Sequence, residues 1–235
     1  MKLHLRELVV LGVVFILLGF LGYSLVNQQN NHTDLLSSTN PEEKIAEENN
    51  NLNQIELNDN KNMSNEEYST AIIKTNYGTI ILDLYQDVMP ITVGNFVDLA
   101  QEGFYDGTKF HRVISGFMIQ GGDPNTKSDD VASYGTGGPG YTIEDEFVDD
   151  ERLSNVVGTV AMANTGQPNS GGSQFFINVA DNTNLDFDKQ PLTSKHPVFA
   201  RVQDGMDVVR AIEKLPTNER DLPLEPVVIE SIIVR

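Results

Sequence analysis

Few residues of this chain could do chemistry, because it has no cysteine and only four histidines among its 235 residues. The lack of cysteine excludes disulfides, thiolate nucleophiles, iron–sulfur clusters and cysteine-type zinc sites. His4 and His32 lie outside the segment that is expected to fold, which leaves His111 and His196. These two have no spacing typical of metal ligands, so the sequence predicts neither a metal nor another cofactor.

Two strings resemble known binding motifs but each lacks a required residue, and a third motif is absent. The glycine-rich GTGGPG at 135–140 is not followed by the Lys-Ser or Lys-Thr pair of a phosphate loop. The acidic run that starts at Asp123 has Tyr134 where a calcium loop needs its twelfth-position Glu. No G-x-S-x-G string is present, so a serine hydrolase of that type is excluded.

What remains is one arginine among apolar and amide side chains. Arg112 lies in FHRVI at 110–114, and FMIQGGD follows at 117–123. In a strand, Arg112 and Ile114 share one face, and His111 takes the other. The residues alone leave two interpretations open: a binding site around Arg112, or core strands with Arg112 in a surface ion pair.

The elements that must position these residues lie in the segment 71–235. Alternating or β-branched runs predict strands at 71–75, 78–85, 110–114, 117–120, 158–163, 174–179, 198–202 and 227–234. Helical spacing of apolar residues predicts one helix at 92–101 and a second after Asp204, which is the expected N-cap. Many short strands with only two helices favour a mainly β barrel or sandwich.

The N-terminal part of the chain is predicted to hold the domain at a membrane. Residues 8–26 carry no charge, and as a helix they would span about 28 Å, close to the roughly 30 Å of a bilayer core. Lys2 and Arg6 precede this run, so residues 1–7 should stay cytoplasmic and the rest should be exported. No small-residue cleavage site follows, which favours an uncleaved signal anchor in the cell membrane; cleavage would give a secreted or periplasmic protein.

Residues 27–70 are predicted to be a disordered linker, because they are rich in Asn and Glu and nearly free of aromatic residues. The whole chain has a formal net charge of −18. Such a charge repels phosphate backbones, so nucleic acid is excluded as a partner.

Two long strings carry a family resemblance. FHRVISGFMIQGGD at 110–123 and AMANTGQPNSGGSQFFI at 161–177 resemble the two most diagnostic stretches of the cyclophilins, the peptidyl-prolyl cis–trans isomerases. Their order and spacing match as well, and so do the flanking GTIILDLY, NFVDLAQEGFYDG and VFARVQDGMDVV, so that the resemblance covers residues 71–235. It implies a closed antiparallel barrel of eight strands capped by two α-helices, which works as a monomeric catalytic domain.

The resemblance also implies roles for individual residues. Arg112 matches the catalytic arginine of the family. The residues that would line the pocket for the proline ring are Phe117, Met118, Phe176 and Leu185. Those that would surround and orient the peptide are His111, Gln120, Ala163, Asn164, Gln174 and His196.

The chain departs from the family pattern near Leu185. Asn184 stands where many members have a tryptophan, and the loop FDKQPLTSK at 187–195 is longer than in compact members. The segment between Asn164 and Gln174 carries one extra residue. The lost aromatic surface predicts weaker binding of cyclosporin-type inhibitors.

The expected function is therefore isomerisation of X–Pro bonds in unfolded or nascent exported polypeptides, by a domain tethered to the membrane through its N-terminal helix. The main alternative is a non-catalytic, cyclophilin-like peptide-binding or chaperone module at the membrane. Arg112 favours the enzyme, because a module that only binds peptide has no need of this arginine.

Overall fold

The computed structural model describes residues 68–190 and 195–235. The predicted n-region 1–7, the anchor 8–26 and nearly all of the linker 27–70 lie outside these ranges. Within them, no helix combines the length and the apolar character needed to cross a membrane.

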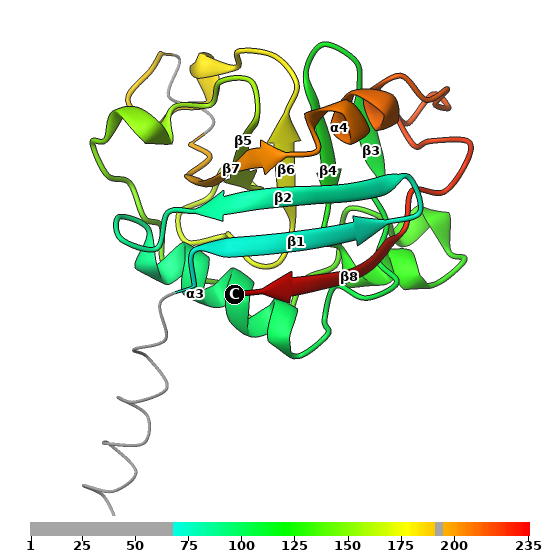
Figure 1. Cartoon of the computed structure of the whole chain (residues 1–235), viewed down its shortest axis with the longest axis horizontal. Helices are drawn as coiled ribbons and strands as arrows, with labels where there is room; N and C mark the ends of the chain where they lie inside the picture. The colour runs from blue at the N-terminus through cyan, green and yellow to red at the C-terminus, as the bar shows by residue number, and fades with distance from the viewer. Residues whose placement is uncertain (1–67, 191–194) are drawn as a thin grey trace, which may run out of the picture. The chain divides into compact units, whose positions relative to one another are not determined.

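Eight antiparallel strands form one sheet in the order β3-β4-β6-β5-β7-β2-β1-β8 (Figure 1). The strands are β1 (Thr70–Thr75), β2 (Gly78–Leu84), β3 (Arg112–Ile114), β4 (Met118–Gly121), β5 (Thr159–Met162), β6 (Phe175–Asn178), β7 (Val198–Asp204) and β8 (Ile229–Val234). All eight predicted strands are present, and their ends differ from the prediction by no more than two residues.

The sheet is an open half-barrel, so the prediction of a closed barrel is wrong. β3 and β8 are the two edge strands and do not pair with each other. Only the irregular segment before β3 meets β8, where Thr108 O accepts a hydrogen bond from Ile229 N at 2.8 Å. The outer edge of β3 is covered instead by a turn, because Val113 N donates to Asp221 O at 2.8 Å. β3 is only three residues long, and this turn takes the place of β8 beside it.

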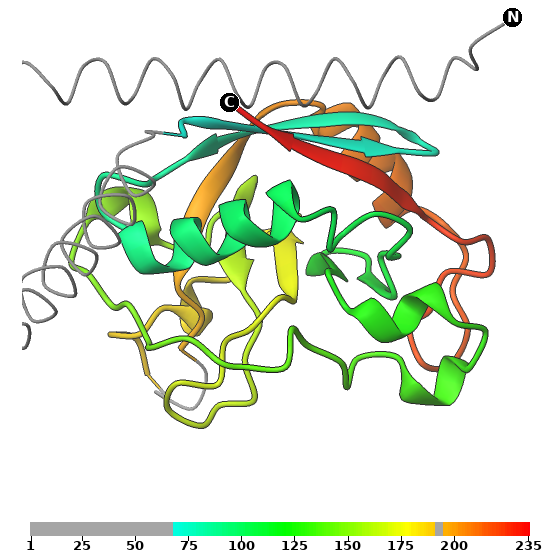
Figure 2. The same ribbon diagram turned by 90° about the horizontal axis from the view of Figure 1, so that it is seen from below.

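Two α-helices pack against the sheet, as predicted. α3 (Pro90–Gln101) lies under β8 (Figure 2), and α4 (Met206–Glu213) contacts β2, β3 and β4. Asp204 is not the N-cap of α4, contrary to the prediction. It ends β7, and Gly205 is the N-cap, with a φ of 89° that favours glycine. Four short 3₁₀-helices complete the described ranges: η2 (Pro124–Lys127), η3 (Val131–Ser133), η4 (Glu151–Leu153) and η5 (Thr183–Leu185).

The start of α3 is capped by a residue far away in sequence. The N-cap residue Met89 forms no side-chain cap. Instead, Glu146 accepts hydrogen bonds from Ile91 N at 3.1 Å and from Thr92 N at 2.9 Å. The carboxylate thus satisfies N–H groups that the helix itself leaves free, at the end where the helix dipole favours negative charge.

We therefore expect Glu146→Ala to lower the free energy of unfolding by about 1 kcal/mol, as the loss of a cap does. Urea denaturation of both proteins measures the difference. Glu144→Ala is the matched control, because Glu144 is exposed on the same loop. If both variants lose the same stability, Glu146 does not act as the cap.

An aromatic cluster fills the centre of the core. The Phe96 ring from α3 is fully buried. Its centroid lies 5.4 Å from that of Tyr105, 5.7 Å from that of Phe175 and 5.2 Å from that of Phe199. Phe175 belongs to β6, so this cluster fixes the same strand that carries the site residue Phe176.

Candidate active site

Three of the predicted site residues form a row across neighbouring strands. Arg112 of β3 lies opposite Gln120 of β4, and Gln120 lies opposite Phe176 of β6. Directly opposed residues of antiparallel strands point to the same face of a sheet. The strand register therefore places a cation, an amide and an aromatic ring on one face.

Arg112 is accessible at the end of this row. Its side chain is 42 % exposed, and its Nε lies 3.6 Å from Oδ2 of Asp221. The ion pair that the alternative interpretation expected is thus present. Among the described residues, Asp221 is the one polar partner of this guanidinium, whose other N–H donors remain able to bind a ligand.

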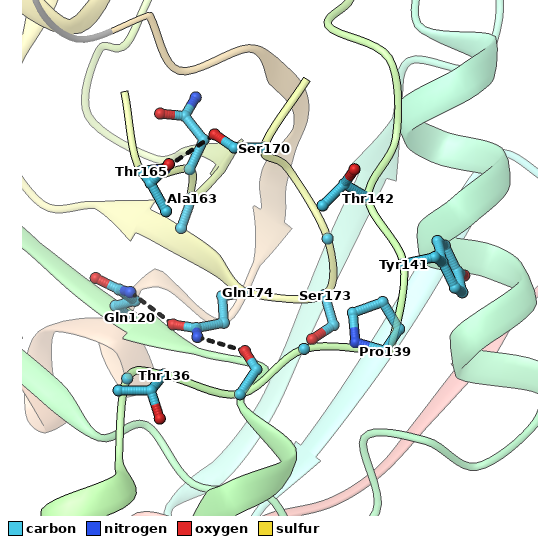
Figure 3. Close-up of a pocket in the computed structure, with 15 residues that line it drawn as sticks. Gln120, Thr136, Pro139, Tyr141, Thr142, Ala163, Thr165, Ser170, Ser173 and Gln174 are labelled. Atoms are coloured by element: carbon cyan, nitrogen blue, oxygen red, sulfur yellow. Dashed lines mark hydrogen bonds between the residues drawn. The ribbon is translucent and has the colours of Figure 1, made fainter. Parts of the chain in front are cut away.

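Gln120 belongs to a chain of amides that fixes its orientation (Figure 3). Gln120 Nε2 donates to Gln174 Oε1 at 3.0 Å, and Gln174 Nε2 donates to the Gly137 carbonyl at 2.8 Å. Ala163 N in turn donates to the Gln174 carbonyl at 2.9 Å. Because the Nε2 groups of Gln120 and Gln174 both donate within this chain, the positions of these side-chain amides are set before a peptide binds.

Five of the six predicted peptide-binding residues line two cavities that share Gln120 and Gly135, whereas His196 lines neither. The first, which we call the central cavity, has a volume of about 520 Å³ and is lined by Gln120, Ala163, Asn164 and Gln174 together with 135–139. The second, which we call the arginine cavity, has a volume of about 310 Å³ and is lined by His111, Arg112, Gln120, Val131, Tyr134, Gly135, Arg220 and Leu222. Asn164 also holds the loop end, since its Nδ2 donates to the Lys195 carbonyl at 2.6 Å.

Leu185 and Phe176, two of the predicted proline-pocket residues, are connected through His196, and none of the four predicted residues lines the central cavity or the arginine cavity. The ring of His196 meets that of Phe176 edge-on at 5.3 Å, and His196 N donates to Leu185 O at 3.0 Å. Phe117 is connected to the same region, because its carbonyl accepts from Asn182 Nδ2 at 2.8 Å. Met118 is only 1 % exposed and belongs chiefly to the core.

A buried polar network that the sequence did not indicate supports this region. Asp186 accepts hydrogen bonds from Asn155 N at 2.7 Å and from Asn155 Nδ2 at 2.9 Å. Asn155 Nδ2 also donates to the His196 carbonyl at 3.1 Å. The network thus joins Asp186 and His196, which flank the long loop at 187–195. No local pattern marks these three residues, which are far apart in the sequence.

Both histidines of the site are held neutral by burial. Burial lowers the pKa of His111 and the pKa of His196 from the ordinary value of 6.5, and for His111 the nearby Asp123 carboxylate opposes the shift. His196 Nδ1 lies 3.1 Å from the Met162 carbonyl, so a neutral ring with its proton on Nδ1 donates there. Across 68–190 and 195–235, no group of three or more His, Asp or Glu side chains could hold a metal ion.

We expect kcat/KM to be flat between about pH 6.5 and 9, because neither histidine gains a proton in this range. Stability should fall as the pH decreases below about 6.5, since the unfolded chain then binds protons that the native histidines resist. Urea denaturation at pH 7.5 and 5.5 measures this fall, and His196→Asn should reduce it. A step in kcat/KM near pH 6.5 would instead show that a histidine takes part in the reaction.

Comparison with known proteins decides the family. The model of the family "Cyclophilin type peptidyl-prolyl cis-trans isomerase/CLD" matches residues 70–234. The chain belongs to the cyclophilins. The resemblance found in the two motif strings is thereby confirmed over the whole described domain, and the protein is a peptidyl-prolyl cis–trans isomerase.

This cyclophilin matches bacterial relatives over almost their full length. Peptidyl-prolyl cis-trans isomerase B of Escherichia coli is 45 % identical over an alignment of 167 residues, and the match covers 68 % of this chain and 96 % of the relative. Peptidyl-prolyl cis-trans isomerase B of Streptomyces anulatus is 44 % identical over an alignment of 182 residues, and the match covers 70 % of this chain and 95 % of the relative.

Solved structures agree with the cyclophilin fold. A cyclophilin-type isomerase from Cryptosporidium parvum, crystallised in the presence of the dipeptide Ala-Pro, has a TM-score of 0.60 and 29 % identity. The match covers 71 % of this chain and 98 % of that one.

Proposed function

We propose that Arg112 is the catalytic residue of this isomerase, and that the X–Pro bond rotates over the face that Arg112 shares with Gln120 and Phe176. The observation that carries the proposal is the cross-strand row of these three residues. It sets a charged donor, a fixed amide and an apolar ring beside one another, which are the groups that a twisted prolyl peptide needs.

The reaction requires no nucleophile and no proton transfer. Rotation is slow because it breaks amide resonance, with a barrier of about 18–20 kcal/mol. In the twisted transition state the prolyl nitrogen regains its lone pair. An arginine N–H that hydrogen-bonds to this nitrogen, or to the neighbouring prolyl carbonyl, stabilises the twisted form more than either planar isomer.

Arginine suits this role because it stays protonated and presents several donors in one rigid plane. The Asp221 carboxylate at Nε restricts how that plane can turn. Phe117 and Phe176 offer the apolar surface on which a proline ring can pack. Exclusion of water from this surface strengthens the hydrogen bond from Arg112.

The remaining site residues would hold the flanking peptide while one side of the bond rotates. Gln120 and Gln174 are fixed by their mutual hydrogen bond at 3.0 Å. The backbone around Ala163 and Asn164 borders the central cavity, where an extended peptide can bind. A peptide anchored on one side of the bond leaves only the other side free to turn.

Nuclear magnetic resonance of the full chain, labelled with ¹⁵N in arginine, tests this assignment. On addition of an Ala-Pro-containing tetrapeptide, the Nε–H signal of Arg112 should shift and that of Arg201 should not. Arg201 lies on β7, paired with Asp83 and outside the site. Faster isomerisation of the peptide without a change at Arg112 would contradict the proposed role.

We further propose that the enzyme is anchored in the cell membrane and acts on exported proteins while they fold. The support comes from the sequence: an uncharged stretch at 8–26, the preceding Lys2 and Arg6, and an Asn-rich spacer. Slow X–Pro isomerisation limits folding in any compartment, so exported chains need the activity too.

Protease treatment of intact spheroplasts that express the full chain tests this location. The full chain should remain in the membrane fraction after a carbonate wash, and protease added outside should degrade its C-terminal domain. A domain that is protected until the cells are lysed would contradict export.

A further inference from the structure

The arginine cavity adjoins a third cavity that the proposed catalytic role does not use. This cavity, which we call the leucine cavity, has a volume of about 260 Å³. It shares Val131, Tyr134 and Leu222 with the arginine cavity. The central cavity, the arginine cavity and the leucine cavity are therefore successive neighbours, with the arginine cavity between the other two.

The lining of the leucine cavity is mainly apolar, with Lys109, Asp129 and Tyr134 as its polar members, and two of its apolar side chains are exposed. Leu224 is 65 % exposed and Val131 is 38 % exposed, and both line this cavity. The other apolar residues of the lining are Phe110, Leu222, Pro223, Pro226 and Val227. Exposed apolar side chains that gather in a hollow beside a peptide-binding site mark a surface that gains from being covered.

The backbone around Leu224 is held in place, so the exposure of this side chain is built into the fold. Leu224 N donates to the Pro216 carbonyl at 2.9 Å, and Thr217 is bridged to Pro223. On the opposite wall, Tyr134 Oη donates to the Ser128 carbonyl at 2.6 Å. Binding therefore costs little conformational entropy, because the backbone of both segments is already fixed before a ligand arrives.

We propose that the leucine cavity binds an apolar side chain of the same polypeptide whose X–Pro bond lies at Arg112. The proposal rests on the proposed function, and it names the substrate class more narrowly: an unfolded segment with a Leu- or Phe-like residue several positions from the proline. The argument for this occupant is proximity, since Val131 and Tyr134 line both the arginine cavity, where the chain would lie, and the leucine cavity next to it.

Isomerase assays of the purified full chain with two kinds of peptide test the proposal. The tetrapeptide Ser-Ala-Pro-Ser has one X–Pro bond and no large apolar side chain, so it has nothing to place in the leucine cavity. Fifteen-residue peptides carry a single central proline and one Phe, placed in turn at each position on either side in a Ser/Gln background. At one position or two adjacent ones, Phe should raise kcat/KM about tenfold through a lower KM, as burial of one large apolar side chain predicts.

Leu224→Ser should remove this gain and leave the tetrapeptide rate unchanged. Because Leu224 is mostly exposed, the variant should fold, and the tetrapeptide rate checks that it does. Val157→Ser is the matched control: Val157 is 44 % exposed and lines none of the three cavities. It should keep the full gain.

Three results would overturn the proposal. One is a scan in which no position of Phe raises kcat/KM, and another is an equal loss of the gain in Leu224→Ser and Val157→Ser. The third is a wild-type dimer in light scattering that Leu224→Ser converts to monomer, which would assign the patch to a second copy of the chain. If the tetrapeptide itself is not isomerised, the proposed function fails instead.

Discussion

Arg112→Ala is expected to lower kcat/KM for X–Pro rotation on the order of 100-fold, which is about 2.7 kcal/mol of transition-state stabilisation. The reason is that Arg112 supplies the one charged donor in the row with Gln120 and Phe176. The loss should fall mainly on kcat, because the guanidinium binds the twisted form more tightly than the planar substrate. An isomerisation assay with a tetrapeptide measures both constants.

Arg112→Lys separates charge from geometry. Lysine keeps the positive charge but loses the planar fork of donors, so most of the loss should remain. Arg201→Ala is the control, because Arg201 forms an ion pair with Asp83 on the exposed surface of β7 and lies outside the site. A near-wild-type rate in Arg112→Ala would show that the apolar pocket alone accelerates rotation.

Phe96→Ala is expected to lower the free energy of unfolding by about 3–5 kcal/mol. Phe96 is fully buried, and three aromatic rings lie within 5.7 Å of it between centroids. Deletion of its ring leaves a cavity that strands on both sides cannot close. Since domains of this kind are stable by only about 5–15 kcal/mol, the variant should unfold at far lower urea.

Phe187→Ala is the matched control for this deletion. Phe187 is partly exposed and stacks on a single ring, that of Phe147, at 5.5 Å. Deletion of the Phe187 ring should lower the free energy of unfolding by only a small fraction of the loss expected for Phe96→Ala. If Phe96→Ala lowers the free energy of unfolding as little as Phe187→Ala does, the core tolerates the cavity at Phe96 and the prediction is wrong.

The strands and helices could be predicted because their signals are local. Short apolar, β-branched or partly alternating runs marked every strand of the sheet, and helical spacing marked α3 and α4. The errors concern features that local patterns do not encode. Asp204 has the chemistry of an N-cap, but the turn there needs a positive φ, which Gly205 supplies.

Closure of the barrel could not be predicted from the sequence for a similar reason. Whether β3 pairs with β8 depends on which segment of the chain occupies the outer edge of β3. The Asp221 turn does so, and it lies about a hundred residues further along the chain. The pattern of apolar residues in β8 or in the Asp221 turn does not indicate which of the two segments will lie beside β3.

The candidate site could be listed from its motifs, but its arrangement could not be derived from them. The register that sets Arg112 opposite Gln120 is fixed by the short turn between β3 and β4, but the pairing of Gln120 with Phe176 joins two strands that are far apart in the sequence. Asp221 and Arg220, which border Arg112, lie in a stretch without any motif. They enter the site only because the chain folds back over β3 there.

The turn that covers β3 has a consequence for an isomerase that binds proline-containing peptides. An uncovered strand edge offers free N–H and C=O groups to any extended segment, and such pairing can recruit further strands and end in aggregation. Here Val113 N is occupied by Asp221 O, and at the other edge Ile229 N is occupied by Thr108 O. At these two points an extended peptide cannot pair with the strand edge, so the fold discourages addition of a further strand there.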